Sequence, residues 1–154
     1  MQLQQDVLKM RGSIELVLHG PQGEELRRWK ENTVVTVGRV WILKQLESVD
    51  IATAQTISYI EIGSSTVAPT TADTALGAAV TRRAISSFDT SGLTANPPFW
   101  QAQVSYATNE ANTQLAEAGM FQSSAAGTLI AHATYASFTK ATSNTLSISW
   151  NLSN

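Results

Sequence analysis

The chain has 154 residues, of which 43% are apolar and only 14% charged, with a net charge of −2 and no cysteine. This length predicts one domain, with or without an arm, and the absence of cysteine excludes disulfides and thiolate metal sites. No run of about 18 apolar residues occurs, so we expect no membrane-spanning segment. The first residues lack the charged start and apolar stretch of a secretion signal. We therefore expect a protein that is made in the cytoplasm and kept whole.

Charged residues are scarce and unevenly placed. An ordinary soluble domain has about 25% of them, whereas here Ser, Thr, Ala, Asn and Gln take their place. Such a surface is typical of a Thr-rich β-domain, and equally of faces that end up against other protein. Residues 1–44 hold seven bases and five acids (net +2), and the remainder holds three bases and seven acids (net −4). Opposite charges could favour head-to-tail contacts between subunits, with a solvated hairpin edge as the alternative.

Residues 1–11 have an apolar pattern with helical spacing. Leu3, Val7 and Met10 stand at i, i+4 and i+7 with polar residues between them, which indicates a short amphipathic helix. A helix this short is marginal in water and needs a surface to lie on. We interpret the segment as an arm that orders against a neighbouring subunit and trades chain entropy for contact area. A frayed terminus is the alternative.

Residues 12–31 are predicted to form a β-hairpin. Residues 13–18 alternate between apolar and polar, the turn signal GPQG follows at 20–23, and a second strand returns over 26–30. Arg27, Arg28 and Lys30 lie beside Trp29, and bases next to an aromatic ring are typical of nucleic-acid sites. Three bases in an acidic chain with a pI near 5.6 argue against that partner. Charges on a hairpin edge usually block unwanted strand pairing, and we retain Arg27, Arg28 and Trp29 as candidate interface residues.

The next segment contains the one convincing helix, predicted over residues 36–48. Asn32 or Thr33 could cap it. Val37, Val40, Trp41 and the stem of Lys44 are expected to form one face, with Leu43 and Leu46 beside it. Alternatively, the valines at 34, 35 and 37 prolong a strand and the helix starts near Gly38. The helix is expected to cover one end or face of a sheet.

Residues 56–154 are predicted to form the main sheets. Strand patterns occur at 57–62, 80–88, 99–106, 116–121, 129–138 and 146–152, separated by turn signals and without a fixed repeat. Together with the hairpin they predict a mainly β domain over residues 12–154. The expected architecture is a jelly-roll-like antiparallel β-sandwich of about seven to nine strands with one α-helix. The Arg82–Arg83 pair is placed at an edge or an interface.

No motif in the sequence indicates chemistry. His19 and His132 have no second nitrogen or carboxylate at ligand spacing, and no phosphate-binding loop or nucleophile elbow occurs. Glu110 and Glu117 could serve as a glycosidase pair only if a cleft brought them together. Glu117 is interpreted instead as a buried carboxylate bonded to backbone amides. We expect no enzyme activity, no cofactor and no metal. A sugar-binding platform built from some of the Trp and Tyr residues stays open as an alternative.

The order of these segments resembles that of small virion proteins of tailed bacteriophages over nearly the whole chain. The resemblance is carried by 12–16 (GSIEL), 32–39 (NTVVTVGR), 59–76 (YIEIGSSTVAPTTADTAL), 117–121 (EAGMF), 127–131 (GTLIA), Lys140 and 145–152 (TLSISWNL). It implies that a strand leads into a Thr/Ala/Pro-rich loop, which Asp73 and Leu76 hold down.

The same resemblance implies a structural role in a virion, after assembly in the host cytoplasm. The expected function is that of a capsid decoration, or cement, protein that stabilises the shell. The expected partners are copies of the chain itself, as a homotrimer or another symmetric oligomer, and the major capsid protein. A tail or fibre-attachment component is the first alternative, with tail proteins as partners, and a carbohydrate-binding receptor module is the second. Neither nucleic acid nor membrane is expected as a partner.

Overall fold

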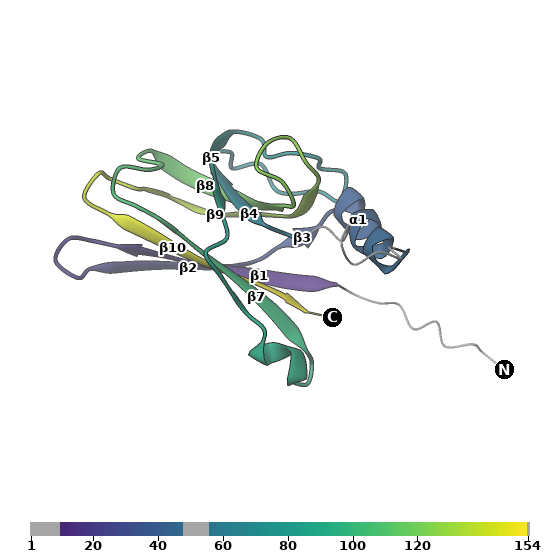
Figure 1. Cartoon of the computed structure of the whole chain (residues 1–154). Helices are drawn as coiled ribbons and strands as arrows, with labels where there is room; N and C mark the ends of the chain where they lie inside the picture. Colours follow the sequence, from purple (N-terminus) through teal and green to yellow (C-terminus); the bar gives the residue numbers. More distant parts are fainter. Residues whose placement is uncertain (1–9, 48–55, 154) are drawn as a thin grey trace.

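The computed structural model describes residues 10–47 and 56–153 and shows two stacked antiparallel sheets with a helix at one end (Figure 1). The described strands are β1 (Arg11–His19), β2 (Glu25–Glu31), β3 (Thr33–Val34), β4 (Tyr59–Gly63), β5 (Ala79–Ala84), β6 (Ser87–Asp89), β7 (Phe99–Tyr106), β8 (Gln114–Phe121), β9 (Leu129–Thr139) and β10 (Thr145–Ser153). The helices are α1 (Thr36–Glu47) and a short 3₁₀ helix, η2 (Ser91–Thr94). The predicted sandwich with one α-helix is confirmed. The strands number ten among the described residues because the short β3 and β6 had not been separated.

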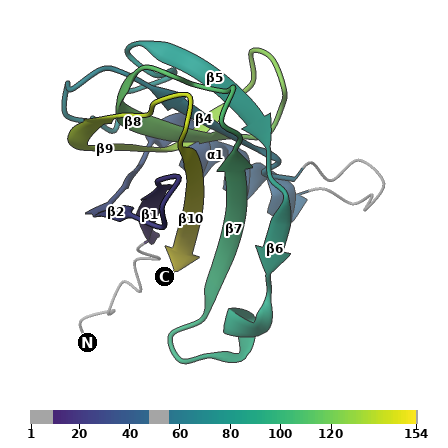
Figure 2. The same cartoon turned by 90° about the vertical axis from the view of Figure 1, so that its left-hand side faces the viewer.

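The first sheet has the strand order β2-β1-β10-β7-β6. Its centre follows the alternation expected for a strand with one buried face. On β10, Leu146, Ile148, Trp150 and Leu152 point into the core, and the residues between them are partly exposed. β1 pairs with β10 along its whole length, from Arg11 opposite Ser153 to His19 opposite Thr145. Figure 2 shows that the β6–β7 hairpin, with η2 at its tip, extends beyond the end of β10.

The second sheet has the order β3-β9-β8-β4-β5 and is covered on both faces. One face packs on the first sheet. On the other face lies the loop 64–78, beneath which Leu76 forms a small apolar cluster with Val35, Phe121 and Leu129. This third layer explains why β8 is buried from Leu115 to Phe121 instead of alternating.

Helix α1 packs against β9 so closely at Gly38 that a side chain at this position would not fit. A Cβ built on Gly38 would stand 2.3 Å from the carbonyl oxygen of Ile130 and 2.6 Å from its Cα. Because Gly38 faces the sheet, Trp41 lies on the packed side of the helix. Val37 and Val40 are 37% and 47% exposed. Of the face predicted to contain Val37, Val40 and Trp41, Trp41 therefore packs on the core while the two valines are exposed.

Candidate functional site: an apolar groove beside the helix

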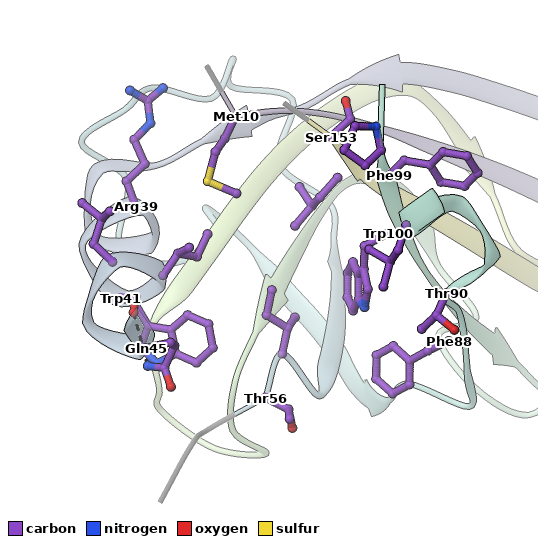
Figure 3. A pocket seen from close by; sticks show the side chains of 16 residues that line it. Met10, Arg39, Trp41, Gln45, Thr56, Phe88, Thr90, Phe99, Trp100 and Ser153 are labelled. Atoms are coloured by element: carbon purple, nitrogen blue, oxygen red, sulfur yellow. Dashed lines mark hydrogen bonds between the residues drawn. The ribbon is translucent and has the colours of Figure 1, made fainter. Parts of the chain in front are cut away.

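A groove of about 900 Å³ opens between α1 and the β6–β7 hairpin. One wall consists of α1 side chains, chiefly Trp41, Ile42 and Leu43, and the opposite wall of Phe88, Leu93, Phe99 and Trp100 from the hairpin. Figure 3 shows the labelled side chains of the two walls on opposite sides of the groove, with Met10 and Ser153 between them. The groove depends on the long β6–β7 hairpin, which stands past the end of the sheet.

The lining of this groove is mostly apolar and accessible to water. Leu43 is 53% exposed, Leu93 55% and Phe88 46%. The Phe88 and Trp100 rings contact each other with centroids 5.4 Å apart and an interplanar angle of 37°. Exposed apolar side chains that gather in one place, rather than singly, mark an interaction site. A rigid sandwich on one side and a helix held by Gly38 on the other fix the shape of this site.

Met10, the first residue that the structure describes, lies at the groove. Met10 lines the groove and packs against the core, directly before β1. Of the predicted arm residues, Leu3 and Val7 lie outside the described residues. Among the described residues that line the groove, Arg39 is the charged one, and it is exposed.

A second feature lies under the loop 64–78, where Glu117 is fully buried. Its carboxylate accepts hydrogen bonds from the backbone N–H groups of Ser65 at 3.2 Å, Gly77 at 3.0 Å and Ala78 at 2.7 Å. Three N–H donors from both ends of the loop therefore converge on one side chain of β8. This is the arrangement that the sequence suggested for Glu117, and it fixes the path of the loop.

His132 connects this carboxylate to a second one. Its Nε2 lies 3.0 Å from Glu117 Oε2, and its Nδ1 lies 2.7 Å from Asp73 Oδ2. Both ring nitrogens face carboxylate oxygens. Two hydrogen bonds therefore need either a doubly protonated ring that donates to both, or a neutral ring that donates to one carboxylate and accepts from the other in its protonated form. Partial burial acts to raise the pKa of Asp73. Hydrogen bonds from the Thr70 hydroxyl and N–H and from His132 outweigh it, and the pKa lies below its usual value.

Sequence reasoning treated His132 as an isolated histidine and missed this contact. Its partners are 15 and 59 residues away in the sequence, and only the β8–β9 register and the loop bring them together. The three side chains form a chain with the ring in the middle, rather than converging on one point. Among the described residues no group of three or more His, Asp or Glu is arranged to hold a metal ion.

The candidate interface residues of the hairpin lie on β2, an edge strand of the first sheet. Arg27 pairs with Glu15 at 3.2 Å and Glu25 at 2.8 Å, and Arg28 donates to the carbonyl of Ala136. Trp29 is 64% exposed. The structure places these residues on one edge, apart from the groove.

Arg82 and Arg83 have different surroundings. Arg82 pairs with Glu61 at 2.9 Å, donates to the carbonyls of Ser123 and Ala126, and lies 3.7 Å from the centre of the Phe121 ring. Only 13% of its side chain is exposed, and it serves contacts within the chain. Both arginines lie on β5, an edge strand of the second sheet, which is one of the two placements that the sequence predicted. Arg83 is more exposed and pairs with Glu110.

Glu110 and Lys140 also serve loop contacts. Glu110 accepts from the N–H of Ala107 at 2.7 Å besides pairing with Arg83. Lys140 is buried, which lowers its pKa, and its ammonium donates to Asn112 Oδ1 at 2.8 Å. Glu117 is fully buried and hydrogen-bonded to backbone N–H groups, unlike a carboxylate that faces a substrate cleft in a glycosidase pair.

No family model, curated protein or solved structure matches this chain. Within the described residues, no helix has the length and apolar character needed to cross a bilayer.

Proposed function

We propose that this chain is a non-enzymatic structural protein that assembles with copies of itself, and that it decorates and stabilises the capsid of a tailed bacteriophage. The observation that carries the proposal is the apolar groove between α1 and the β6–β7 hairpin. A surface of this kind is stabilised when another protein covers it, because each Å² of apolar area removed from water contributes about 25 cal/mol.

The outer face of β7 and β10 in the first sheet supports the same reading. It presents uncharged polar side chains: Gln101 of β7 donates to Asn151 of β10 at 2.9 Å, and Gln103 donates to Gln101 on its own strand at 2.9 Å. Charged side chains of the outer face, such as Glu15, Glu25 and Arg27, lie on β1 and β2, and these three pair with one another, which leaves the β7 and β10 part free of charge. It can lie against another protein surface without burying unpaired charges.

The location in a virion rests on the sequence resemblance, and the capsid is the preferred site within it. A decoration protein must make lateral contacts at many equivalent positions, which suits a chain with an apolar groove and a polar sheet face. A tail component would need the same contacts at low copy number.

The deciding experiment is the copy number of the protein in purified particles, measured by quantitative mass spectrometry against the major capsid protein. A number in the hundreds, or equal to the three-fold positions of the shell, supports capsid decoration. About six or twelve copies, the numbers typical of ring symmetries, would assign the protein to the tail. Absence from particles would overturn the virion proposal.

One observation favours a carbohydrate-binding module as a second candidate. The groove gathers aromatic rings that could stack on a sugar, with Phe88 and Trp100 in contact. Sugar sites also need several polar groups that converge on the ligand, and few polar side chains line this groove. Titration with glycans from the host surface, followed by NMR, distinguishes the two. Shifts of groove residues at millimolar glycan support this second candidate.

A further inference from the structure

The edge of the groove is also the point at which the N-terminal segment joins the sandwich. Met10 lines the groove, and Arg11, the next residue, begins β1 opposite Ser153 near the end of β10. On its other side β1 pairs with β2 only from Ser13 onward. The described part of the chain therefore begins at the groove end of the first sheet, and residues 1–9 are attached there.

The segment 1–9 has the composition that such a groove would bind. Leu3 and Val7 continue the spacing of Met10, so one helical face carries all three apolar side chains. Nine residues span about 14 Å as a helix and at most about 30 Å when extended. The first length is suited to lying along a groove of about 900 Å³, and the second allows the segment to reach a neighbouring molecule.

The instability of an isolated short helix points in the same direction. The segment carries one acid, Asp6, and one base, Lys9, and Asp6 has an opposite charge available in Arg39 among the described residues of the groove. A helix of this length does not persist alone in water, so it needs an apolar surface. A segment that is attached at the groove end is well placed for the groove of a neighbour, and identical subunits can exchange such segments reciprocally at low cost.

We propose that residues 1–9 of one copy fill the groove of a neighbouring copy, with Leu3 and Val7 packed between α1 and the β6–β7 hairpin. This inference rests on the proposed function, because it presupposes that the chain assembles. It names the contact through which assembly occurs.

The absence of cysteine allows a direct test by cross-linking. Leu3→Cys and Leu93→Cys are made in separate full-length chains, mixed, and treated with a short bismaleimide. We expect a product of doubled mass that contains one chain of each variant. Leu3→Cys mixed with Gln22→Cys, in the exposed β1–β2 turn away from the groove, should give at least tenfold less product.

A double variant with both Leu3→Cys and Leu93→Cys in one chain completes the test. If it cross-links only within the chain, with no mixed product from the single variants, the segment fills its own groove and the inference is wrong. If light scattering shows an oligomer but neither experiment gives a groove cross-link, the inference is wrong and the proposed assembly stands. If the protein stays monomeric and is absent from particles, the proposed function is wrong as well.

Discussion

The loop 64–78 and the groove beside α1 lie in the same fold but have opposite surroundings. Beneath the loop, Glu117 is fully buried with three backbone donors and His132 around it, and Leu76 is seated in its own apolar cluster. In the groove, Leu43, Leu93 and Phe88 remain about half exposed. The first region is complete within one chain, and the second gains stability only when something covers it.

This difference separates stability from assembly. Substitutions beneath the loop should lower the free energy of unfolding, although they do not alter the side chains that line the groove. Substitutions of exposed groove residues should leave the fold intact and weaken association. If both kinds of substitution changed the unfolding free energy and the association equally, stability and assembly would not be separate properties of these two regions.

The largest effect is expected for Glu117→Ala. The change leaves three backbone N–H groups and His132 without their acceptor in a buried site, which costs about 3–5 kcal/mol of unfolding free energy. Urea denaturation measures it. The control is Glu15→Ala, which removes a surface ion pair with Arg27 and should cost less than about 1 kcal/mol. Equal losses in the two variants would contradict a structural role for the Glu117 contacts.

Gly38→Ala should have the second largest effect. The added methyl group would meet the backbone of Ile130, which cannot move aside as a side chain could. We expect a loss of about 1–3 kcal/mol in urea denaturation, although alanine favours a helix over glycine by about 1 kcal/mol. Val40→Ala, on the exposed side of the same helix, should stay within about 0.5 kcal/mol of the wild type. A stabilised Gly38→Ala variant would show that α1 is not held against β9.

Strand β10, helix α1 and His132 show how much of the structure could be predicted from the sequence. The alternation on β10 predicted its strand to within one residue at each end, because one buried face leaves a period of two in the sequence. The contact between α1 and β9 was not predicted, because its tightest point is a glycine, which carries no hydrophobic signal. The roles of His132 and of the groove depend on strand register and on segments far apart in the sequence. No local pattern reports either of them.

A smaller effect is expected for Thr70→Val, which removes the hydroxyl that donates to Asp73 at 2.6 Å. Because hydrogen bonds lower the pKa of Asp73, its ionised form stabilises the fold above its ordinary pKa of 3.8, and this stability is lost as the pH falls through the lower folded value. The variant should therefore be about 1 kcal/mol less stable at pH 7.

The pH dependence provides the check on this prediction. The difference in unfolding free energy between wild type and Thr70→Val should shrink below pH 4, where Asp73 becomes protonated next to His132 and Glu117. An NMR titration should show a higher pKa for Asp73 in the variant. Thr66→Val, at an exposed position in the same loop, serves as the control. A stability difference that is constant from pH 7 to pH 2.5 would contradict the assigned cause.

The smallest effect on stability, and the largest on assembly, is expected for the double variant Leu43→Gln and Leu93→Ser. Both side chains are more than half exposed, so the unfolding free energy should change by less than about 0.5 kcal/mol for each substitution. If the groove is covered in the assembled state, each substitution should reduce the free energy of association by roughly 1.4 kcal/mol or more, which weakens association about tenfold per residue. Analytical sedimentation measures the association constant.

Val67→Ser is the matched control for that variant. Val67 is 73% exposed, more than either leucine, but it lies on the loop 64–78 rather than in the groove. If exposure alone drove association, Val67→Ser should weaken it at least as much as the double variant does. If the groove is the contact, Val67→Ser should assemble like the wild type. An equal loss in both variants would mean that the apolar surface acts without a defined site.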